Sequence, residues 1–124
     1  MEKSIAVYNI ISLPEQFYNP ENKRSAAELL KGSGFFEFCN EIGQNEIEHF
    51  LRESPNLIDR WLEWSGDKRT DSGWYFDLDA NHRYVVGFVS SQNTRIAPMI
   101  FSDKYVACAT YIYREIASIS EGAL

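Results

Sequence analysis

Two aspartates and a histidine near residue 80 are the first candidates for catalytic chemistry. Asp77 and Asp79 flank Leu78, so on a β-strand both carboxylates project from one face, and His82 follows in a turn. Paired carboxylates beside an imidazole can act as general acid and base or hold a metal ion. Arg83 is an expected cross-strand neighbour, so an ion-paired surface explains the same residues. We expect no activity from this group, but a small hydrolase or ligand-binding enzyme using Asp77, Asp79 and His82 remains an alternative.

A second candidate group surrounds His49. Glu46 and Glu53 stand three residues before it and four after it, which places all three on one side of an expected helix. This spacing suits a metal ion or an acid–base pair, but a solvated, ion-paired helix face explains it equally well. The two cysteines, Cys39 and Cys108, lack metal-ligand spacing and are predicted to be buried thiols in a reducing cytoplasm. No metal or cofactor is expected.

The negative charge of the chain is concentrated in its middle. Residues 37–79 include eleven acidic and four basic residues, a net charge of −7, whereas the whole 124-residue chain carries −6. Direct nucleic-acid binding depends on Lys and Arg neutralising phosphates, so this composition disfavours it. An acidic surface would instead steer a basic protein towards it. Solubility is the simpler explanation of the same charge.

The N-terminal half of the chain is predicted to be a run of short helices with brief connections. Ser25 and Glu28 have the spacing of a capping box, which predicts a helix over 26–31. Apolar residues at helical spacing predict three more helices between residues 35 and 66. The apolar residues of 4–18 fit neither helical nor strand periodicity, so this segment is expected to be a helix or an irregular arm.

The C-terminal half is predicted to be a three-stranded antiparallel β-meander closed by one long helix. Three aromatic and β-branched runs lie between residues 73 and 101, separated by turn residues. Gly87 in the second run indicates a bulge or a close approach of backbone or ring, and Pro98 makes the third run an edge strand. The amphipathic helix from about Lys104 to Ser120 is expected to pack on this sheet. The expected fold class is therefore α+β.

Length and composition predict one α+β domain over residues 1–124. Hydrophobic residues make up 44% of the chain and aromatic residues 15%, which suffices for a core. The apolar runs are too short to span a membrane, and the first residues lack the pattern of a secretory signal. A cytoplasmic protein with no membrane contact is expected.

Several segments of the C-terminal half together resemble a known family. The segments are Gly73-Trp74-Tyr75-Phe76, Tyr84-Val85-Val86-Gly87-Phe88, Phe101-Ser102-Asp103, Ala107-Cys108-Ala109-Thr110-Tyr111-Ile112 and Arg114-Glu115-Ile116. In them the chain resembles immunity proteins of bacterial toxin–immunity systems, including those paired with contact-dependent growth inhibition toxins. The resemblance implies a cytoplasmic inhibitor without catalytic residues. Such an inhibitor docks on a cognate toxin domain, commonly a nuclease, and blocks its active site.

If the chain is such an inhibitor, its acidic window would mimic the phosphates that a basic nuclease binds. The expected toxin-binding acids are Glu46, Glu53, Asp59, Glu63, Asp67, Asp71, Asp77 and Asp79, and the expected aromatic anchors are Trp64, Trp74 and Tyr75. Opposite charges would speed association, and the anchors would slow dissociation. An adaptor module for another endogenous protein would have the same sequence features, so that alternative also stays open.

Overall fold

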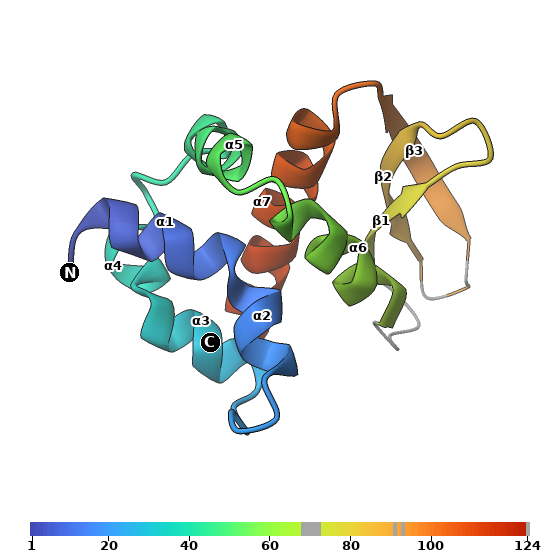
Figure 1. Cartoon of the computed structure of the whole chain (residues 1–124). Helices are drawn as coiled ribbons and strands as arrows, with labels where there is room; N and C mark the ends of the chain where they lie inside the picture. Colours follow the sequence, from blue (N-terminus) through green and yellow to red (C-terminus); the bar gives the residue numbers. More distant parts are fainter. Residues whose placement is uncertain (68–72, 91, 93, 124) are drawn as a thin grey trace.

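The chain folds into short helices followed by a small sheet and one long helix (Figure 1). The structure is a computed structural model and describes residues 1–67, 73–90, 92 and 94–123. The helices are α1 (Lys3–Ile11), α2 (Leu13–Tyr18), α3 (Ala26–Ser33), α4 (Phe35–Phe38), α5 (Gln44–Glu53), α6 (Leu57–Asp67) and α7 (Lys104–Ala123). The strands are β1 (Gly73–Leu78), β2 (Tyr84–Val89) and β3 (Arg95–Phe101). This arrangement confirms the predicted α+β class.

The segment left open between helix and arm forms two helices, α1 and α2. Ala6, Val7 and Ile10 are buried at helical spacing, whereas Ile5 and Tyr8 are exposed. The periodicity was hidden because the small Ala6 faces the core while two large apolar side chains face outwards. Pro14 stands in the first turn of α2, where its missing N–H costs no hydrogen bond.

Helix α3 begins with the predicted capping box and ends at a glycine. The Ser25 hydroxyl accepts from the Glu28 backbone N–H at 3.2 Å, and the Glu28 carboxylate accepts from the Ser25 N–H at 3.3 Å, which completes the capping box. The helix runs past the predicted 26–31 and ends at Gly34, whose φ of 97° lies in the left-handed region that glycine tolerates.

The prediction of a helix over 35–42 is wrong in length. It is the single turn α4, and its expected apolar stripe is interrupted because Phe36 and Cys39 are exposed. The prediction of two buried thiols therefore holds for Cys108 alone. Burial raises the pKa of the Cys108 thiol well above its usual value, so that thiol stays protonated and unreactive.

The sheet is the predicted antiparallel meander, in the order β1-β2-β3. Trp74 pairs with Phe88 and Phe76 with Val86, so these aromatic and aliphatic side chains share one face. The β2–β3 register shifts between Val86, which pairs with Met99, and Phe88, which pairs with Ile96, so the extra residue of this bulge lies in β3, opposite Gly87. A Cβ at Gly87 would lie 2.6 Å from the hydroxyl oxygen of Tyr75, so the predicted close approach at this glycine is confirmed, and it is made by a ring. The strand that contains Pro98 is an edge strand, as predicted.

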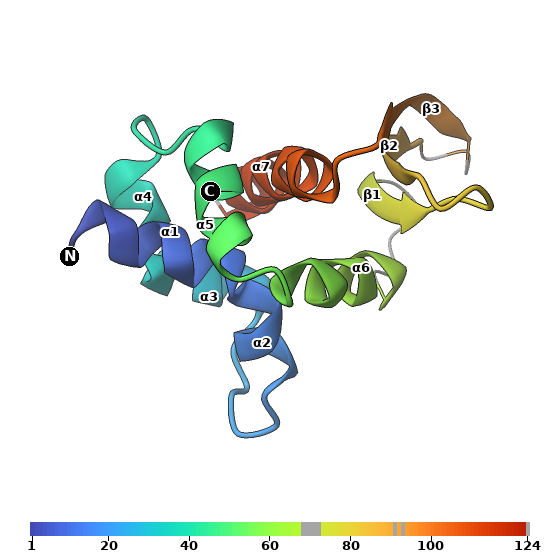
Figure 2. The ribbon, with the colours of Figure 1, turned by 45° about the horizontal axis from the view of Figure 1, so that its top comes forward.

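Helix α7 lies at the centre of the molecule and packs on more than the sheet. It runs between the N-terminal helices and the strands, and both views show helices on its other side (Figures 1 and 2). Its neighbours include α5 and α3 as well as β1 and β2. The buried run Ala107–Ala109 has only small side chains, which allows close approach, and Tyr111 and Ile112 are fully buried beyond it. The prediction that α7 covers the sheet is confirmed, but its contacts with α3 and α5 were not foreseen.

Helix α6 is fixed to both halves of the fold. The buried indole N–H of Trp61 donates to the carbonyl of Ile11 at 2.8 Å, which ties α6 to the end of α1. The backbone N–H of Phe76 donates to the Ser65 hydroxyl at 2.7 Å, which ties α6 to β1. One cluster of buried hydrophobic side chains continues from α1 through α6 to α7. In the part of the chain that is described, no helix is long and apolar enough to cross a bilayer.

Candidate docking surface

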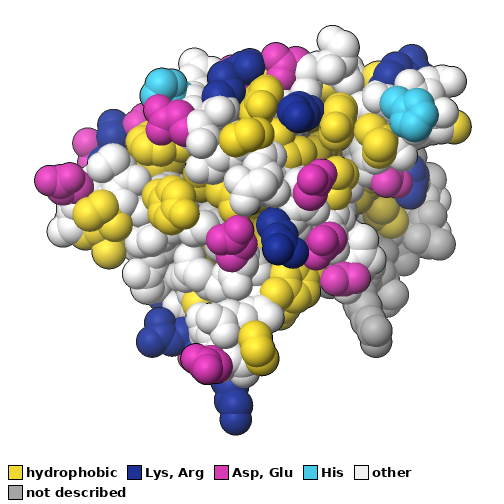
Figure 3. Space-filling model, viewed as in Figure 1, with side chains coloured by type: hydrophobic (Ala, Val, Ile, Leu, Met, Phe, Trp, Pro, Cys, Tyr) yellow, Lys and Arg dark blue, Asp and Glu magenta, His cyan; other side chains and the backbone are white. Residues whose placement is uncertain are grey.

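The acidic residues expected to bind a toxin lie on three different elements. Glu46 and Glu53 are on α5, Asp59, Glu63 and Asp67 are on α6, and Asp77 and Asp79 are at the end of β1 and in the turn after it. Asp71 lies outside the described residues. Acidic side chains gather most clearly over α6 in the lower middle of the space-filling view, around one basic side chain (Figure 3).

The two acids of α5 already have partners within the chain. Lys3 lies 3.0 Å from the carboxylate of Glu46, and the His49 imidazole lies 3.5 Å from that of Glu53. These side chains are solvent-exposed to a third or more, so the pairs contribute little to stability. The spacing of His49 with its two glutamates thus produces a surface ion pair with Glu53, while Glu46 turns to α1.

Asp79 and His82 belong to the hairpin turn between β1 and β2, whereas Asp77 lies in β1, opposite Val85. One carboxylate oxygen of Asp79 accepts from the backbone N–H groups of Asn81 (2.9 Å) and Arg83 (2.8 Å), and the other accepts from the Arg83 guanidinium at 3.0 Å. These bonds, the Arg83 N–H foremost, lower the pKa of Asp79. His82 has a φ of 60°, a turn conformation that histidine adopts more readily than most side chains. The expected Arg83–Asp79 ion pair is confirmed.

The three acids of α6 form a row along one side of the helix. Asp59, Glu63 and Asp67 are spaced four residues apart, and all are exposed. The opposite side of the helix is buried through Ile58, Trp61 and other apolar residues. Arg60 lies 3.7 Å from Glu63, a distance at which two exposed side chains interact weakly.

Two exposed aromatic rings of α2 stand beside this row, and sequence analysis missed both. Phe17 and Tyr18 expose 40% and 39% of their surface. The Phe17 ring meets the Trp64 ring edge-on at 5.1 Å, and the Tyr18 hydroxyl donates to the Asp67 carboxylate at 2.9 Å. The signal was present in Pro14, which predicts a helical turn, but the ambiguous periodicity of 4–18 left the direction of these rings open.

The α2–α6 surface is defined here by one set of exposed side chains. The set is Glu15, Phe17, Tyr18, Asp59, Arg60, Glu63 and Asp67. Tyr18 and Arg60, together with Glu15 and Asn19, line an open depression between the two helices. Partial burial, the hydrogen bond to Asp67 and the negative charges of Asp67 and Glu63 raise the pKa of Tyr18 to about 12. The phenol therefore remains a neutral donor at physiological pH.

The expected anchors Trp64 and Tyr75 are not available to a partner in this structure. Trp64 exposes 7% of its surface, because it packs on Trp61 and donates its indole N–H to the Glu115 carboxylate at 2.8 Å. Tyr75 exposes 8%, because its ring covers Gly87 and the Arg95 guanidinium lies 4.5 Å from its centroid. Trp74 is half-buried between Phe88 and other neighbours. Docking through Trp64 or Tyr75 would require the core to open.

A buried carboxylate lies beneath the α2–α6 surface. Glu115 on α7 exposes 3% of its surface and accepts from the Trp64 indole and, at 3.1 Å, from the Tyr111 hydroxyl. Burial and then the negative charge of Glu115 raise the pKa of Tyr111. Since Phe17 packs on Trp64 from outside, a chain of contacts connects the exposed ring to this buried group.

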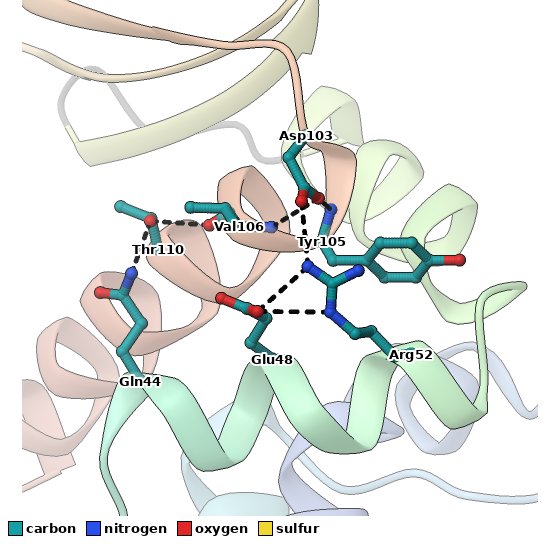
Figure 4. A network of polar contacts seen from close by, with 7 residues as sticks. All are labelled: Gln44, Glu48, Arg52, Asp103, Tyr105, Val106 and Thr110. Carbon is teal, nitrogen blue, oxygen red and sulfur yellow. Dashed lines mark hydrogen bonds and ion pairs between the residues drawn. The ribbon is translucent and has the colours of Figure 1, made fainter.

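An exposed polar network joins α5 to the start of α7 and has a structural role (Figure 4). The Arg52 guanidinium bonds Glu48 at 3.1 Å and Asp103 at 2.9 Å, and it lies over the Tyr105 ring. Asp103 in turn caps α7 by accepting from the Tyr105 N–H at 2.8 Å. The same two helices are also joined where the side-chain amide of Gln44 in α5 donates to the Thr110 hydroxyl in α7 at 2.8 Å.

Among the residues that the structure describes, no three His, Cys, Asp or Glu side chains are grouped so as to hold a metal ion. Comparison of the chain with protein-family models, curated proteins and solved structures finds no match. The resemblance to immunity proteins therefore stays a prediction, and the α2–α6 surface is the feature on which a function is best argued.

Proposed function

We propose that this protein is an immunity protein that neutralises one cognate toxin domain by direct contact, and that the acidic side of α6 carries that contact. The supporting observation is the row of exposed carboxylates of Asp59, Glu63 and Asp67 beside the exposed rings of α2. Among the other predicted acids that the structure describes, Glu46 pairs with Lys3, Glu53 pairs with His49, and Asp79 holds a turn.

The mechanism is competition for a basic active site. A nuclease binds phosphates through Lys and Arg, and carboxylates spaced along a helix offer it negative charge in place of the nucleic acid. Long-range attraction raises the association rate, and partly buried aromatic contacts lower the dissociation rate. The rigid attachment of α6 to α1 and β1 keeps the row in place before contact, which reduces the entropic cost of binding.

The test pairs the chain with the toxin domain encoded next to it. Cells that express this toxin should survive when the chain is co-expressed, and the purified proteins should form a complex measurable by calorimetry. The toxin's catalytic activity should fall in proportion to the complex formed. A toxin that remains active when saturated with this chain would overturn the proposal, and a complex without protection would favour the adaptor alternative.

A further inference from the structure

We infer that the α2–α6 surface recognises an arginine-bearing segment of its protein partner, with the guanidinium received between the Tyr18 ring and the carboxylates of Glu63 and Asp67. This inference rests on the proposed function, which it deepens by naming the chemistry of the contact.

The two rings are held in fixed positions although they are exposed. Phe17 is packed against Trp64 and meets Tyr18 edge-to-face at 5.5 Å, and the Tyr18 hydroxyl is bonded to Asp67. Rigid aromatic side chains lose little conformational entropy when a partner covers them, and this makes Tyr and Trp common at energetically important interface positions. The rings therefore form a preorganised platform.

The charge around the platform selects a cation. The α2–α6 surface contains four acids and one base, a net charge of −3. The base, Arg60, is half exposed and only 3.7 Å from Glu63, so it can move aside without leaving a buried charge unpaired. A positively charged partner segment is the complementary occupant of such a surface.

Arginine fits this surface better than lysine. A guanidinium is planar, so it can stack on a ring and bond a carboxylate through two N–H groups at once, whereas an ammonium acts as a point charge. Three arginines of this chain already lie over rings: Arg52 over Tyr105, Arg95 over Tyr75 and Arg114 over Trp74. Among the described residues, no cation lies over Phe17 or Tyr18.

The experiment titrates the full chain with two short peptides of equal length and charge, one containing arginine and glycine and the other lysine and glycine. Backbone amide shifts locate the binding site, and the tryptophan fluorescence of the chain, to which Trp64 beside Phe17 contributes, gives a second measure of binding. The arginine peptide should bind about 3- to 10-fold more tightly, the range expected of a cation–π contact at a partly exposed site. The perturbed amides should lie on α2 and α6.

Matched variants distinguish the contribution of the Tyr18 ring to peptide binding from that of the acidic charge. Tyr18→Phe should keep the preference for arginine because the ring remains, and Tyr18→Leu should lower the arginine-to-lysine ratio to the part that bonding to the carboxylates alone provides. Glu63→Lys should weaken both peptides, whereas Glu41→Lys, which makes the same charge change at an exposed site near α4, should weaken them much less. Circular dichroism of each variant checks that the fold is kept.

Equal binding of the two peptides, or perturbed amides away from α2 and α6, would overturn the inference. These outcomes are distinguishable from failure of the proposed function. If the peptides behave as expected but the chain does not protect cells, the surface binds arginine and the toxin hypothesis fails. If Tyr18→Leu still protects fully and the peptides show no preference, the inference fails while the proposed function survives.

Discussion

Tyr18 is the residue whose ionisation reports on the α2–α6 surface. Its folded pKa of about 12 lies above the ordinary 10.0, so the neutral phenol is favoured by the fold. That contribution to stability is complete below pH 10 and is lost as the pH rises through 12. NMR titration of labelled tyrosine should show Tyr18 ionising above the ordinary value of 10.0.

The substitution Asp67→Asn should move the Tyr18 pKa only part of the way back, because partial burial is the largest cause of the shift and remains. Bound arginine peptide should also lower the pKa of Tyr18, since a nearby cation favours the phenolate. A Tyr18 that titrates at the ordinary tyrosine pKa of 10.0 in the unmodified chain would contradict this account of the Tyr18 environment.

Gly87 and Tyr75 form a matched pair on the sheet. In Gly87→Ala the new methyl group would overlap the Tyr75 ring, so the ring must move, at a cost of about 1–3 kcal/mol of unfolding free energy. Tyr75→Phe should be neutral or slightly stabilising, because the buried Tyr75 hydroxyl has no hydrogen-bond partner among the described residues. Urea unfolding measures both. A strongly destabilising Tyr75→Phe would show that the hydroxyl is bonded after all.

Glu115 is expected to be essential for stability. Glu115→Ala leaves the buried donors of Trp64 and Tyr111 without their acceptor, at a cost of about 2–5 kcal/mol. Glu115→Gln keeps an acceptor oxygen, so its cost should be smaller. Thermal unfolding of the two variants gives the comparison, and equal effects of Ala and Gln would mean that the donors contribute little.

At the scale of the elements, the junction of α5 and α7 makes stability sensitive to acid. The hydrogen bond from Arg52, followed by bonds from the α7 N-terminus, lowers the pKa of Asp103 below the ordinary 3.8. The ionised carboxylate therefore stabilises the fold above about pH 4, and this contribution is lost as the pH falls through the lowered pKa. Asp103→Asn should reduce stability at pH 7 and flatten its decline below pH 4, as measured by unfolding midpoints. An unchanged acid dependence would place the sensitivity elsewhere, for example at Asp79.

Elements with strong local signals were predictable from sequence, and elements defined by distant contacts were not. The capping box at Ser25, the glycine at 87 and the proline at 98 each encode a local geometry, and the structure has all three. Helix α1 was ambiguous because exposed Ile5 and buried Ala6 invert the usual pattern. The central position of α7 depends on α3 and α5, and no local pattern encodes those contacts.

The acids of the α2–α6 surface were predictable from sequence, but its aromatic rings were not, because their exposure depends on distant contacts. Charge can be read directly from the sequence, so the acids of α6 were predicted. Because they are four residues apart, the helix places them on one side. Whether a ring faces the core or the solvent depends on tertiary packing. Trp64 is therefore buried against Glu115, and Phe17, from the segment without clear periodicity, is exposed.

Considered as a whole, the molecule separates its acids by role. Glu46, Glu53 and Asp79 pair with Lys3, His49 and Arg83, whereas the row on α6 stands exposed beside the rings of α2, with Glu63 near Arg60 at 3.7 Å and Asp67 bonded to Tyr18. Reversing Asp77 and Asp79 together would therefore be a poor test of docking, because Asp79 holds the turn through the backbone of Asn81 and Arg83. The informative reversal lies on α6.

The double variant Glu63→Lys with Asp67→Lys should slow association with the cognate toxin about 10-fold at low salt and change dissociation less. The fold should tolerate it, because both sites are exposed and cations near the C-terminal end of a helix are favourable.

The control is Glu37→Lys with Glu41→Lys, an equal charge change on exposed residues near α4, which lies away from α6 in both views (Figures 1 and 2). Stopped-flow mixing at two salt concentrations measures both pairs. If attraction to the α6 row drives docking, the α6 variant should lose most of the salt dependence of association, and the control should keep it. Equal slowing by the two variants would mean that net charge alone steers the partner and that the α6 row has no special part in docking.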